Sequence, residues 1–325
     1  MEKTIDVVAL GELLIDFTDN GSSSQGNPVY EANPGGAPCN VLAMLGNLGK
    51  SCAFIGKVGK DMFGEQLKDA LVEVGIDTRG LVMDTEVHTT LAFVHKLPNG
   101  DRDFSFYRNP GADMMLDEND LNHDLIKNCR VFHFGSLSMT SEVCENATRK
   151  AIDEAVAAGA FITFDPNLRE PLWDSLDTAK EKIAYGMSVC NMMKISDNEI
   201  EWFTGIKDYD EAVSFLQEKY PNIELILLSL GRDGSRAYTH KCKASADALL
   251  QEGTVETTGA GDTFCGSMIC GVLEHMQKGG AVKDLTEDEL AKMLNFANTA
   301  ASIITTRKGA LRVMPKPEEV NALLQ

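Results

Sequence analysis

The strongest chemical signal in the chain is the run Thr257-Thr258-Gly259-Ala260-Gly261-Asp262, which opens an apolar helical pattern. Glycines at a helix start leave backbone N–H groups unobstructed, and the helix dipole adds partial positive charge there. The turn therefore predicts an anion site, for example for a transferring phosphoryl group. A carboxylate would weaken a site that only binds an anion, but Asp262 suits a base that accepts a hydroxyl proton. On these residues alone, an Asp262 that only caps the helix is an equally good interpretation.

A second glycine pair lies just ahead of another helical pattern, in the run Asn33-Pro34-Gly35-Gly36-Ala37-Pro38-Cys39-Asn40. Paired glycines let the backbone approach a ligand closely, and the Asn40 side chain offers both a donor and an acceptor to a hydroxyl. The run therefore predicts a site for a hydroxyl-bearing ligand. A tight turn with Pro38 at the first helical position explains the same residues without a ligand.

Two common nucleotide motifs fail in this chain. Gly49-Lys50-Ser51 resembles the end of a P-loop, but Met44 occupies the position of the upstream glycine, and the order is helix then strand. Phe264 stands where a dinucleotide fingerprint needs its third glycine. Neither a P-loop nor a nicotinamide-binding fingerprint is present.

Short apolar segments alternate with helical patterns along most of the chain. The predicted strands cover residues 7–10, 52–58, 131–134, 161–164, 189–195 and 225–230. The predicted helices cover residues 41–48, 63–74, 141–158, 208–220, 261–276 and 286–305, the last opened by a capping box from Thr286 to Glu289. This alternation predicts an α/β fold with a mainly parallel central sheet and helices on both of its faces.

Two stretches interrupt the alternation, at about residues 13–33 and 88–110. Both are typical of antiparallel strands and turns, and the second carries an Asn99-Gly100 hairpin signal. We expect them to form a small β-sheet lid over the site, inserted in a single domain that spans residues 1–325.

Charge and composition exclude several partners. The formal net charge is −19, so the chain offers no basic face for nucleic acid or for an anionic membrane surface. No apolar run approaches the ~20 residues of a membrane span, and no secretion signal is visible. The eight cysteines form no Cys-x-x-Cys pair. We therefore expect a cytoplasmic protein with free, mostly buried thiols.

The two glycine runs resemble, in the right order, the two signatures of the ribokinase-like (PfkB) carbohydrate kinases. The resemblance extends from Val7 to about Pro315. Within the family the chain is most similar to the bacterial fructokinases, through Gly11-Glu12-Leu13-Leu14-Ile15-Asp16, the Gly-Gly-Ala-Pro-x-Asn form of the first signature, Phe106-Tyr107-Arg108-Asn109-Pro110-Gly111-Ala112-Asp113 and Asp165-Pro166-Asn167-Leu168-Arg169. The resemblance implies a ribokinase-like sheet, a lid that often joins a homodimer, a sugar substrate, and ATP with Mg²⁺.

The resemblance also assigns roles to residues. Asp262 matches the catalytic base, and the amides of Gly259, Ala260, Gly261 and Asp262 match the anion hole. Sugar hydroxyls are held at the positions matched by Asp16, Gly35, Gly36 and Asn40. For Asp16 there is a plainer interpretation, because an Asp after an apolar run often caps a turn.

On the nucleotide side, Ser229, Gly231 and Gly234 match the family's ATP-binding turn, and Asn298 falls near the nucleotide pocket. Glu199 matches the acidic residue of the family's Asn-x-x-Glu motif, which organises Mg²⁺ and phosphate, and the resemblance implies an indirect role toward the metal. Ser196 stands at the first position of this motif in place of Asn, a variation that fructokinase-like members resemble. An exposed helix carboxylate is the alternative for Glu199. Glu256 replaces an Asp of the family's monovalent-cation site, which leaves potassium dependence open.

The function implied is transfer of the γ-phosphate of MgATP to the 6-hydroxyl of D-fructose, with Asp262 as base. The alternative is 2-keto-3-deoxygluconate kinase, in which Arg108 and Arg169 would bind the substrate carboxylate, although Arg108 has Asp113 as a competing partner. A non-catalytic sugar-sensing homologue would need a degraded anion hole or a missing base. On the lid, Phe93, Phe104 and Phe106 would form either a dimer contact or a core.

Overall fold

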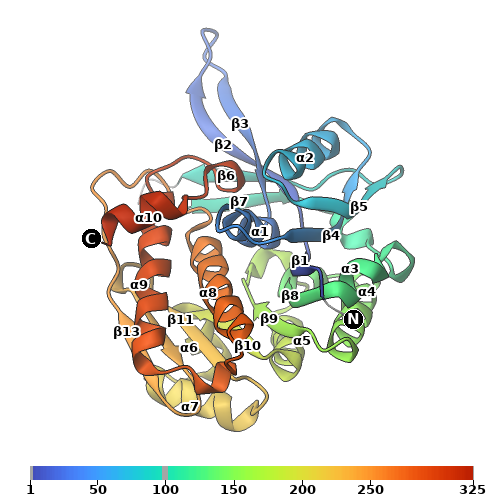
Figure 1. Cartoon of the computed structure of the whole chain (residues 1–325). Coiled ribbons are helices and arrows are strands. Elements are labelled where there is room, and N and C mark those ends of the chain that lie inside the picture. The colour runs from blue at the N-terminus through green and yellow to red at the C-terminus, as the bar shows by residue number, and fades with distance from the viewer. Residues whose placement is uncertain (1–2, 97–101, 325) are drawn as a thin grey trace.

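The central sheet is the feature that positions everything else. The computed structural model describes residues 3–96 and 102–324, so the predicted Asn99-Gly100 turn lies outside the described residues. Nine strands run in the order β13-β12-β11-β10-β9-β8-β1-β4-β5 (Figure 1). Their bounds are β1 Ile5–Leu10, β4 Cys52–Gly59, β5 Asp77–Asp84, β8 Cys129–Gly135, β9 Phe161–Asp165, β10 Met192–Ser196, β11 Leu225–Ser229, β12 Ser235–Tyr238 and β13 Lys243–Ala246. All neighbours are parallel except β11–β12 and β12–β13, which confirms the predicted mainly parallel sheet.

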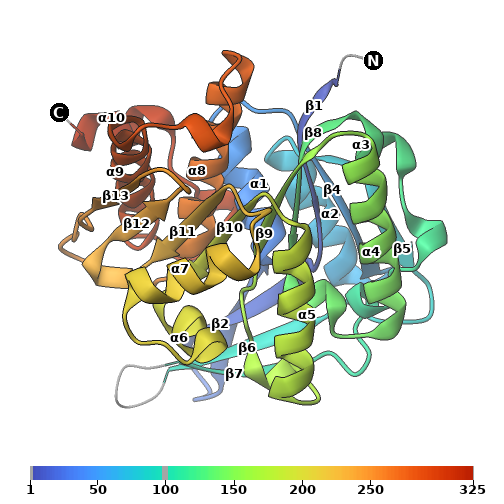
Figure 2. The same ribbon diagram turned by 90° about the horizontal axis from the view of Figure 1, so that it is seen from below.

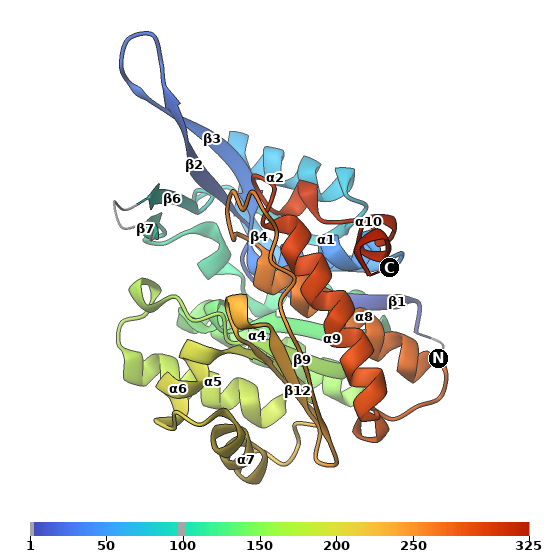
Figure 3. The same ribbon diagram turned by 90° about the vertical axis from the view of Figure 1, so that its left-hand side faces the viewer.

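Helices cover both faces of this sheet, as predicted. One face carries α1 Ala37–Asn47, α2 Met62–Glu73, α8 Ala260–Gln277, α9 Glu287–Ile304 and α10 Pro317–Leu323. The other carries α3 His123–Asn128, α4 Glu142–Ala157, α5 Leu176–Val189, α6 Asp197–Thr204 and α7 Tyr209–Lys219. Figure 3 shows α8 and α9 on one side and α5, α6 and α7 on the other, and Figure 2 shows the same layers from below. Along β1, Val7 joins one core and Val8 the other, because successive side chains of a strand point to opposite faces.

Local signals predicted the helix ends well. The side chain of Thr286 caps α9 in a capping box with Glu289, and Gly49 and Gly75 take left-handed conformations just after α1 and α2. The predicted strand 189–195 was wrong at its start, because α5 continues to Val189 and β10 begins at Met192. An apolar run cannot by itself separate the buried end of a helix from a buried strand.

A second sheet of four strands forms the predicted lid, in the order β3-β2-β6-β7. It contains β2 Leu14–Ser22, β3 Pro28–Gly35, β6 Leu91–Lys96 and β7 Arg102–Tyr107. The β2–β3 and β6–β7 pairs are antiparallel, as predicted, but β2 and β6 join in parallel. The β2–β3 hairpin projects beyond the body of the molecule (Figures 1 and 3).

The lid phenylalanines do not share one face. Phe93 stacks on Phe17 with ring centroids 4.7 Å apart, and Tyr107 packs against Phe93 at 5.4 Å. Phe106 instead lines the cavity beneath the lid. The side chain of Phe104 lies outside the described part of the chain.

Two further features bear on the sequence-based expectations. All eight cysteines are free, and all but Cys242 are buried. Among the described residues, no helix combines the length and apolar character needed to cross a membrane.

Candidate active site

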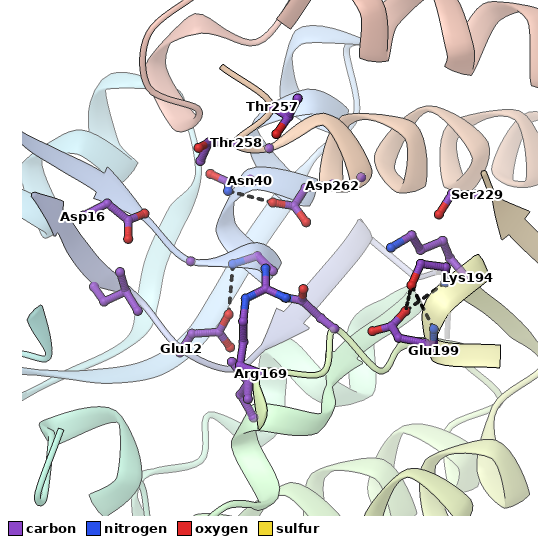
Figure 4. A pocket seen from close by; sticks show the side chains of 18 of the residues that line it. Glu12, Asp16, Asn40, Arg169, Lys194, Glu199, Ser229, Thr257, Thr258 and Asp262 are labelled. Atoms are coloured by element: carbon purple, nitrogen blue, oxygen red, sulfur yellow. Dashed lines mark hydrogen bonds between the residues drawn. The ribbon is translucent and has the colours of Figure 1, made fainter. Parts of the chain in front are cut away.

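A cavity of about 460 Å³ lies between the lid and the carboxyl ends of β9, β10 and β11 (Figure 4). Ligands of open parallel sheets generally bind at this edge. Residues predicted as site residues from the sequence form much of its wall: Asp16, Gly36, Asn40, Arg169, Glu199, Ser229, Gly231, Gly259, Gly261 and Asp262. Five others do not line it, namely Gly35, Arg108, Gly234, Ala260 and Asn298.

The start of α8 places Asp262 at the centre of the cavity. Gly259 is the N-cap with a left-handed φ of 76°, and a Cβ there would lie 2.8 Å from Ala310 Cβ, so this position requires glycine. Ala260 is the first helical residue, and its N–H donates to the carbonyl of Thr257 at 3.2 Å. The N–H groups of Gly261 and Asp262 follow in the first turn, at the cavity end of α8. Asp262 therefore sits in the first turn of a helix whose N-terminus attracts anions.

Asn40 holds the Asp262 carboxylate. Asn40 Nδ2, from α1, donates to Asp262 Oδ2 at 2.8 Å. Burial raises the pKa of Asp262, while Asn40, Lys194 and Arg169 each favour the charged form and limit the rise. The Oδ1 of Asn40 is buried and has no hydrogen-bond partner among the described residues. It is thus placed to accept a hydrogen bond from a ligand hydroxyl.

Asp16 faces the same cavity from β2. Burial raises the pKa of Asp16 to about 7; Arg169 opposes the rise, and Glu256 and Asp262 add to it. Gly35 is not part of the cavity wall but supports Asp16 from β3, because a Cβ on Gly35 would collide with Asp16 Oδ2. The plainer interpretation of Asp16 as a turn cap does not fit, since it lies within a strand.

Glu12 is a pocket carboxyl to which the sequence analysis gave no role. Its Oε1 accepts a hydrogen bond from the N–H of Ala37 at 2.9 Å, and burial raises its pKa to about 7. It therefore fixes the start of α1 and the adjoining Gly36 in the cavity wall. Glu12 stands four residues before Asp16 in the segment that carried the family resemblance. That segment was therefore the signal that could have identified Glu12 as a site residue.

The structure separates the two candidate arginines. Arg108 is buried, and its Nε donates to Asp113 Oδ2 at 2.7 Å, while its terminal nitrogens donate to Thr140 Oγ1 and the carbonyl of Leu137. These partners keep it out of the cavity wall, in line with the competing pairing with Asp113. Arg169 lines the cavity, between Asp16 and Asp262 in electrostatic reach of both.

Asn298, which the resemblance placed near the nucleotide pocket, does not line the cavity. Its Oδ1 accepts from Ser235 Oγ at 2.8 Å, and its Nδ2 donates to the carbonyls of Ala246 and Asp247 at 3.0 and 3.1 Å. It thus ties α9 to the loop after β13. Gly234, with a φ of 91°, packs against the same Ala246 carbonyl.

Glu199 is half-buried and faces the cavity, so the alternative of an exposed helix carboxylate is wrong. Its Oε2 accepts from the N–H and hydroxyl of Ser196, and its Oε1 accepts from the N–H of Leu168 at 2.7 Å. Burial alone would raise the pKa of Glu199, but Lys194 and these hydrogen bonds hold it below its usual value. Glu199 is therefore a charged carboxylate in the cavity wall.

Lys194 is the cavity residue that the sequence analysis missed most clearly. It belongs to β10, is buried, and its Nζ lies 3.1 Å from Asp165 Oδ2. The signal was a lysine inside an otherwise apolar strand, since buried lysines almost always have a specific partner. Asn167 and Asp197 are further polar residues of the wall without a predicted role.

Glu256, which replaces the family's cation-site Asp, is buried and accepts a hydrogen bond from the N–H of Gly309 at 3.1 Å. No cluster of three or more His, Cys, Asp or Glu side chains suited to a metal ion occurs within residues 3–96 and 102–324.

Comparisons with known proteins agree with this geometry. A model of the pfkB family of carbohydrate kinases matches residues 4–317. The chain is 40% identical over 328 residues to the probable fructokinase-4 of Arabidopsis thaliana, covering 100% of this chain and 98% of the relative. It is 39% identical over 323 residues to fructokinase-2 of Solanum lycopersicum, covering 98% and 96%.

Solved structures give the same result. A fructokinase from Xylella fastidiosa with bound ATP superposes with a TM-score of 0.89 at 29% identity, covering 100% of this chain and 99% of that one. A fructokinase from Vibrio cholerae in a form with fructose, ADP and calcium ion superposes with a TM-score of 0.86 at 26% identity, covering 99% of each chain.

Fold and cavity together define a ribokinase-like α/β kinase, with a large sheet, a small lid sheet and a helix N-terminus at the reaction centre. The chain belongs to the pfkB family of carbohydrate kinases. It is therefore a sugar kinase.

Proposed function

We propose that the protein is a fructokinase that transfers the γ-phosphate of MgATP to the 6-hydroxyl of D-fructose. The observation that carries the proposal is the Asn40–Asp262 hydrogen bond of 2.8 Å at the first turn of α8, in the same cavity as Asp16. This arrangement places a base fixed by a hydrogen bond beside an anion-binding helix end and beside groups that can bind hydroxyls. The fructokinases among its relatives support fructose as the sugar.

The sugar end of the cavity suits a neutral polyol. Asp16, Glu12 and Asn40 offer carboxyl and amide groups, while Leu14 and Phe106 offer apolar surface for the C–H faces of a sugar. Burial raises the pKa values of Asp16 and Glu12 to about 7, so each carboxyl group is protonated for much of the time near pH 7 and can then both donate and accept.

The proposed reaction is a single in-line displacement. The fructose 6-oxygen forms a bond to the γ-phosphorus while the bond from that phosphorus to the β–γ bridging oxygen breaks. The electron pair of the broken bond leaves with ADP, and the hydroxyl proton passes to Asp262. The amides at the start of α8 would face the charge that develops on the phosphoryl oxygens. A closed lid excludes water, which would otherwise compete as acceptor.

Magnesium would be held chiefly by the nucleotide. Both carboxylate oxygens of Glu199 already accept hydrogen bonds from Ser196 and Leu168, so Glu199 would reach the ion through water. Asp197 lines the cavity beside it. Oxygen ligands of this kind fit Mg²⁺, which usually keeps several waters and neutralises phosphate charge.

The placement of Arg108 argues against 2-keto-3-deoxygluconate. A carboxylate-bearing substrate needs uncommitted cations, and Arg108 is engaged by Asp113, Thr140 and Leu137. Arg169 remains, but it lies near the carboxyl groups of Asp16 and Asp262. Two carboxyl groups already share this arginine, which makes it a poor site for an added carboxylate.

The decisive experiment is ADP release with MgATP, comparing D-fructose with 2-keto-3-deoxygluconate at equal concentrations. We expect faster turnover with fructose and fructose 6-phosphate as product. Preference for the keto acid would overturn the substrate assignment. In the same assay, Asp262→Asn should lower kcat by ~100-fold or more with nucleotide affinity retained, the usual scale for loss of a general base. Near-normal turnover in that variant would remove Asp262 from the base role.

We also propose that the lid joins two copies of the chain. Phe17, Phe93 and Tyr107 form an aromatic group on the lid face turned away from the cavity, and Tyr107 is 67% exposed. Aromatic side chains of this kind are enriched at protein interfaces.

A further inference from the structure

Lys194 occupies an unusual place for a lysine, because it is buried on β10, an interior strand of the central sheet, near the carboxyl end of that strand. Phe164 of β9 pairs with Met193 of β10, so the next residues, Asp165 and Lys194, lie side by side. Lys194 Nζ is 3.1 and 3.4 Å from the two oxygens of Asp165. Among the described residues, the Asp165 carboxylate is its only hydrogen-bonding partner. An ammonium group has three donors, so donor capacity remains on the cavity side.

The ammonium group points at the anion-binding turn. A Cβ placed on Gly261 would lie 3.3 Å from Lys194 Nζ, so the lysine reaches the first turn of α8. Lys194 lines the cavity together with Gly261 and Asp262, and in Figure 4 its side chain extends toward Asp262 between Ser229 and Glu199. The absence of a side chain at Gly261 thus leaves room for the cation as well as for a ligand.

Three carboxylates surround the ammonium group of Lys194 and stabilise its charge. Burial opposes its charge, but Asp165, Glu199 and Asp262 all favour the ammonium form and raise its pKa above the ordinary value. Arg169, the other cation of the wall, lies toward Asp16 at the sugar end. Lys194 is therefore the cation of the described cavity wall that faces the phosphate side.

We propose that Lys194 contacts the γ-phosphoryl group of the nucleotide and remains bonded to it during transfer, and that Asp165 is the positioning residue that holds it there. The inference rests on the proposed kinase function. Lys194 keeps its proton throughout, because the proton released from the sugar hydroxyl goes to Asp262. Its charge and the amides at the start of α8 would balance the negative charge that the phosphoryl oxygens gain as the bridging bond breaks.

The test compares affinities for two nucleotides by isothermal titration calorimetry with Mg²⁺ and no sugar. The non-hydrolysable ATP analogue AMP-PNP carries a γ-phosphoryl group, and ADP does not. Lys194→Met should weaken AMP-PNP binding by about 10- to 100-fold, the loss expected for a charge-assisted hydrogen bond, and ADP binding by less than about threefold. Lys194→Arg should keep most of the preference, and Asp165→Asn should lose part of it.

Two variants protect the test from a folding artefact. Lys194→Met with Asp165→Asn removes both buried charges, so no carboxylate is left unpaired, and it should show the same selective loss. Lys57→Met removes another buried lysine, which pairs with Asp84 and Asp120 outside the cavity, and should lower stability without changing the nucleotide preference.

Equal loss of both nucleotides, or no loss, in the Lys194 variants would overturn the proposal. Fructose turnover by the wild-type protein tests the kinase assignment separately. The wild-type protein could be inactive with fructose and still bind AMP-PNP more tightly than ADP, with the preference lost in Lys194→Met. That result would overturn only the assignment of fructose as substrate.

Discussion

Asn40 and Asp262, 222 residues apart in the chain, are joined by a hydrogen bond of 2.8 Å from the amide Nδ2 to carboxylate Oδ2. The bond is possible because α1 and α8 pack directly, with Gly266 close to the carbonyl of Val41. It brings the ends of the two glycine signatures together. The proposed base and the proposed hydroxyl-binding group are thus joined by a direct hydrogen bond.

Asn40→Ala should shift the acid limb of the pH–rate profile. The amide of Asn40 favours the charged form of Asp262, so its removal raises the pKa of Asp262 further above the usual range. The base is then deprotonated only at higher pH, and kcat/KM should fall most on the acid side. The measurement is kcat/KM against pH for both proteins. A limb at the same pH in both would contradict the role of Asn40 toward the base.

Arg108 and Arg169 should respond differently to truncation. Arg108→Ala leaves the buried Asp113 unpaired, so it should cost about 3–5 kcal/mol of unfolding free energy. Arg169→Ala should leave the melting temperature nearly unchanged and lower kcat/KM by about 10- to 100-fold, as for a lost charged contact to a substrate. Thermal melts and steady-state kinetics on both variants check this contrast. A stable Arg108 variant with a raised KM would instead place Arg108 at the substrate.

Gly35→Ala should disturb the proposed sugar site indirectly, by displacing Asp16. The added Cβ would displace the Asp16 carboxyl, and a misplacement of this size in a binding group costs about 10- to 100-fold in activity. We expect a higher KM for fructose and an unchanged Kd for ATP. Gly46→Ala is a matched control in α1, where a Cβ would make ordinary contact with the carbonyl of Val74 at 3.5 Å. An unchanged KM for Gly35→Ala would show that Asp16 does not position the sugar.

Asp16 should make stability depend on pH. Its pKa is about 7 in the folded chain and near its ordinary value of 3.8 when unfolded. Its contribution to stability is fully present below about pH 4 and is lost as pH rises through 7. Asp16→Asn should therefore flatten the fall in unfolding free energy between pH 4 and 7, while Glu12, also with a pKa of about 7, maintains part of it. Urea unfolding at pH 5 and pH 8 measures the difference. An equal change in unfolding free energy between pH 5 and pH 8 for wild type and variant would refute the raised pKa of Asp16.

Tyr107→Glu should weaken the proposed lid dimer. The carboxylate introduced at this exposed position would have to be desolvated in the contact between two lids. Light scattering after gel filtration should therefore show dissociation to monomers. Val156→Glu is the control, because Val156 is exposed near the end of α4, which leads into the amino end of β9 at the sheet edge opposite the cavity. A wild-type monomer, or equal effects of both variants, would reject the lid as the interface.

The sequence alone determined features that depend on a few neighbouring residues. The capping box of Thr286 and Glu289 and the glycine turn before Asp262 were predicted correctly, since their hydrogen bonds and backbone angles are set within one helical turn. The strand–helix alternation likewise predicted the mainly parallel sheet, and the two stretches that interrupt it predicted the lid. The resemblance of two short runs to a family then indicated the reaction.

Only the tertiary structure decided which side chains share the cavity. It brought Glu12 and Lys194 into the wall and placed Arg108 against Asp113, outside it. It also joined β2 to β6 in parallel, across an interval that contains α1, β4, α2 and β5. These outcomes depend on contacts between residues far apart in the chain. The burial and charge pairing that select among such contacts exist only once the sheet and its helices have packed together.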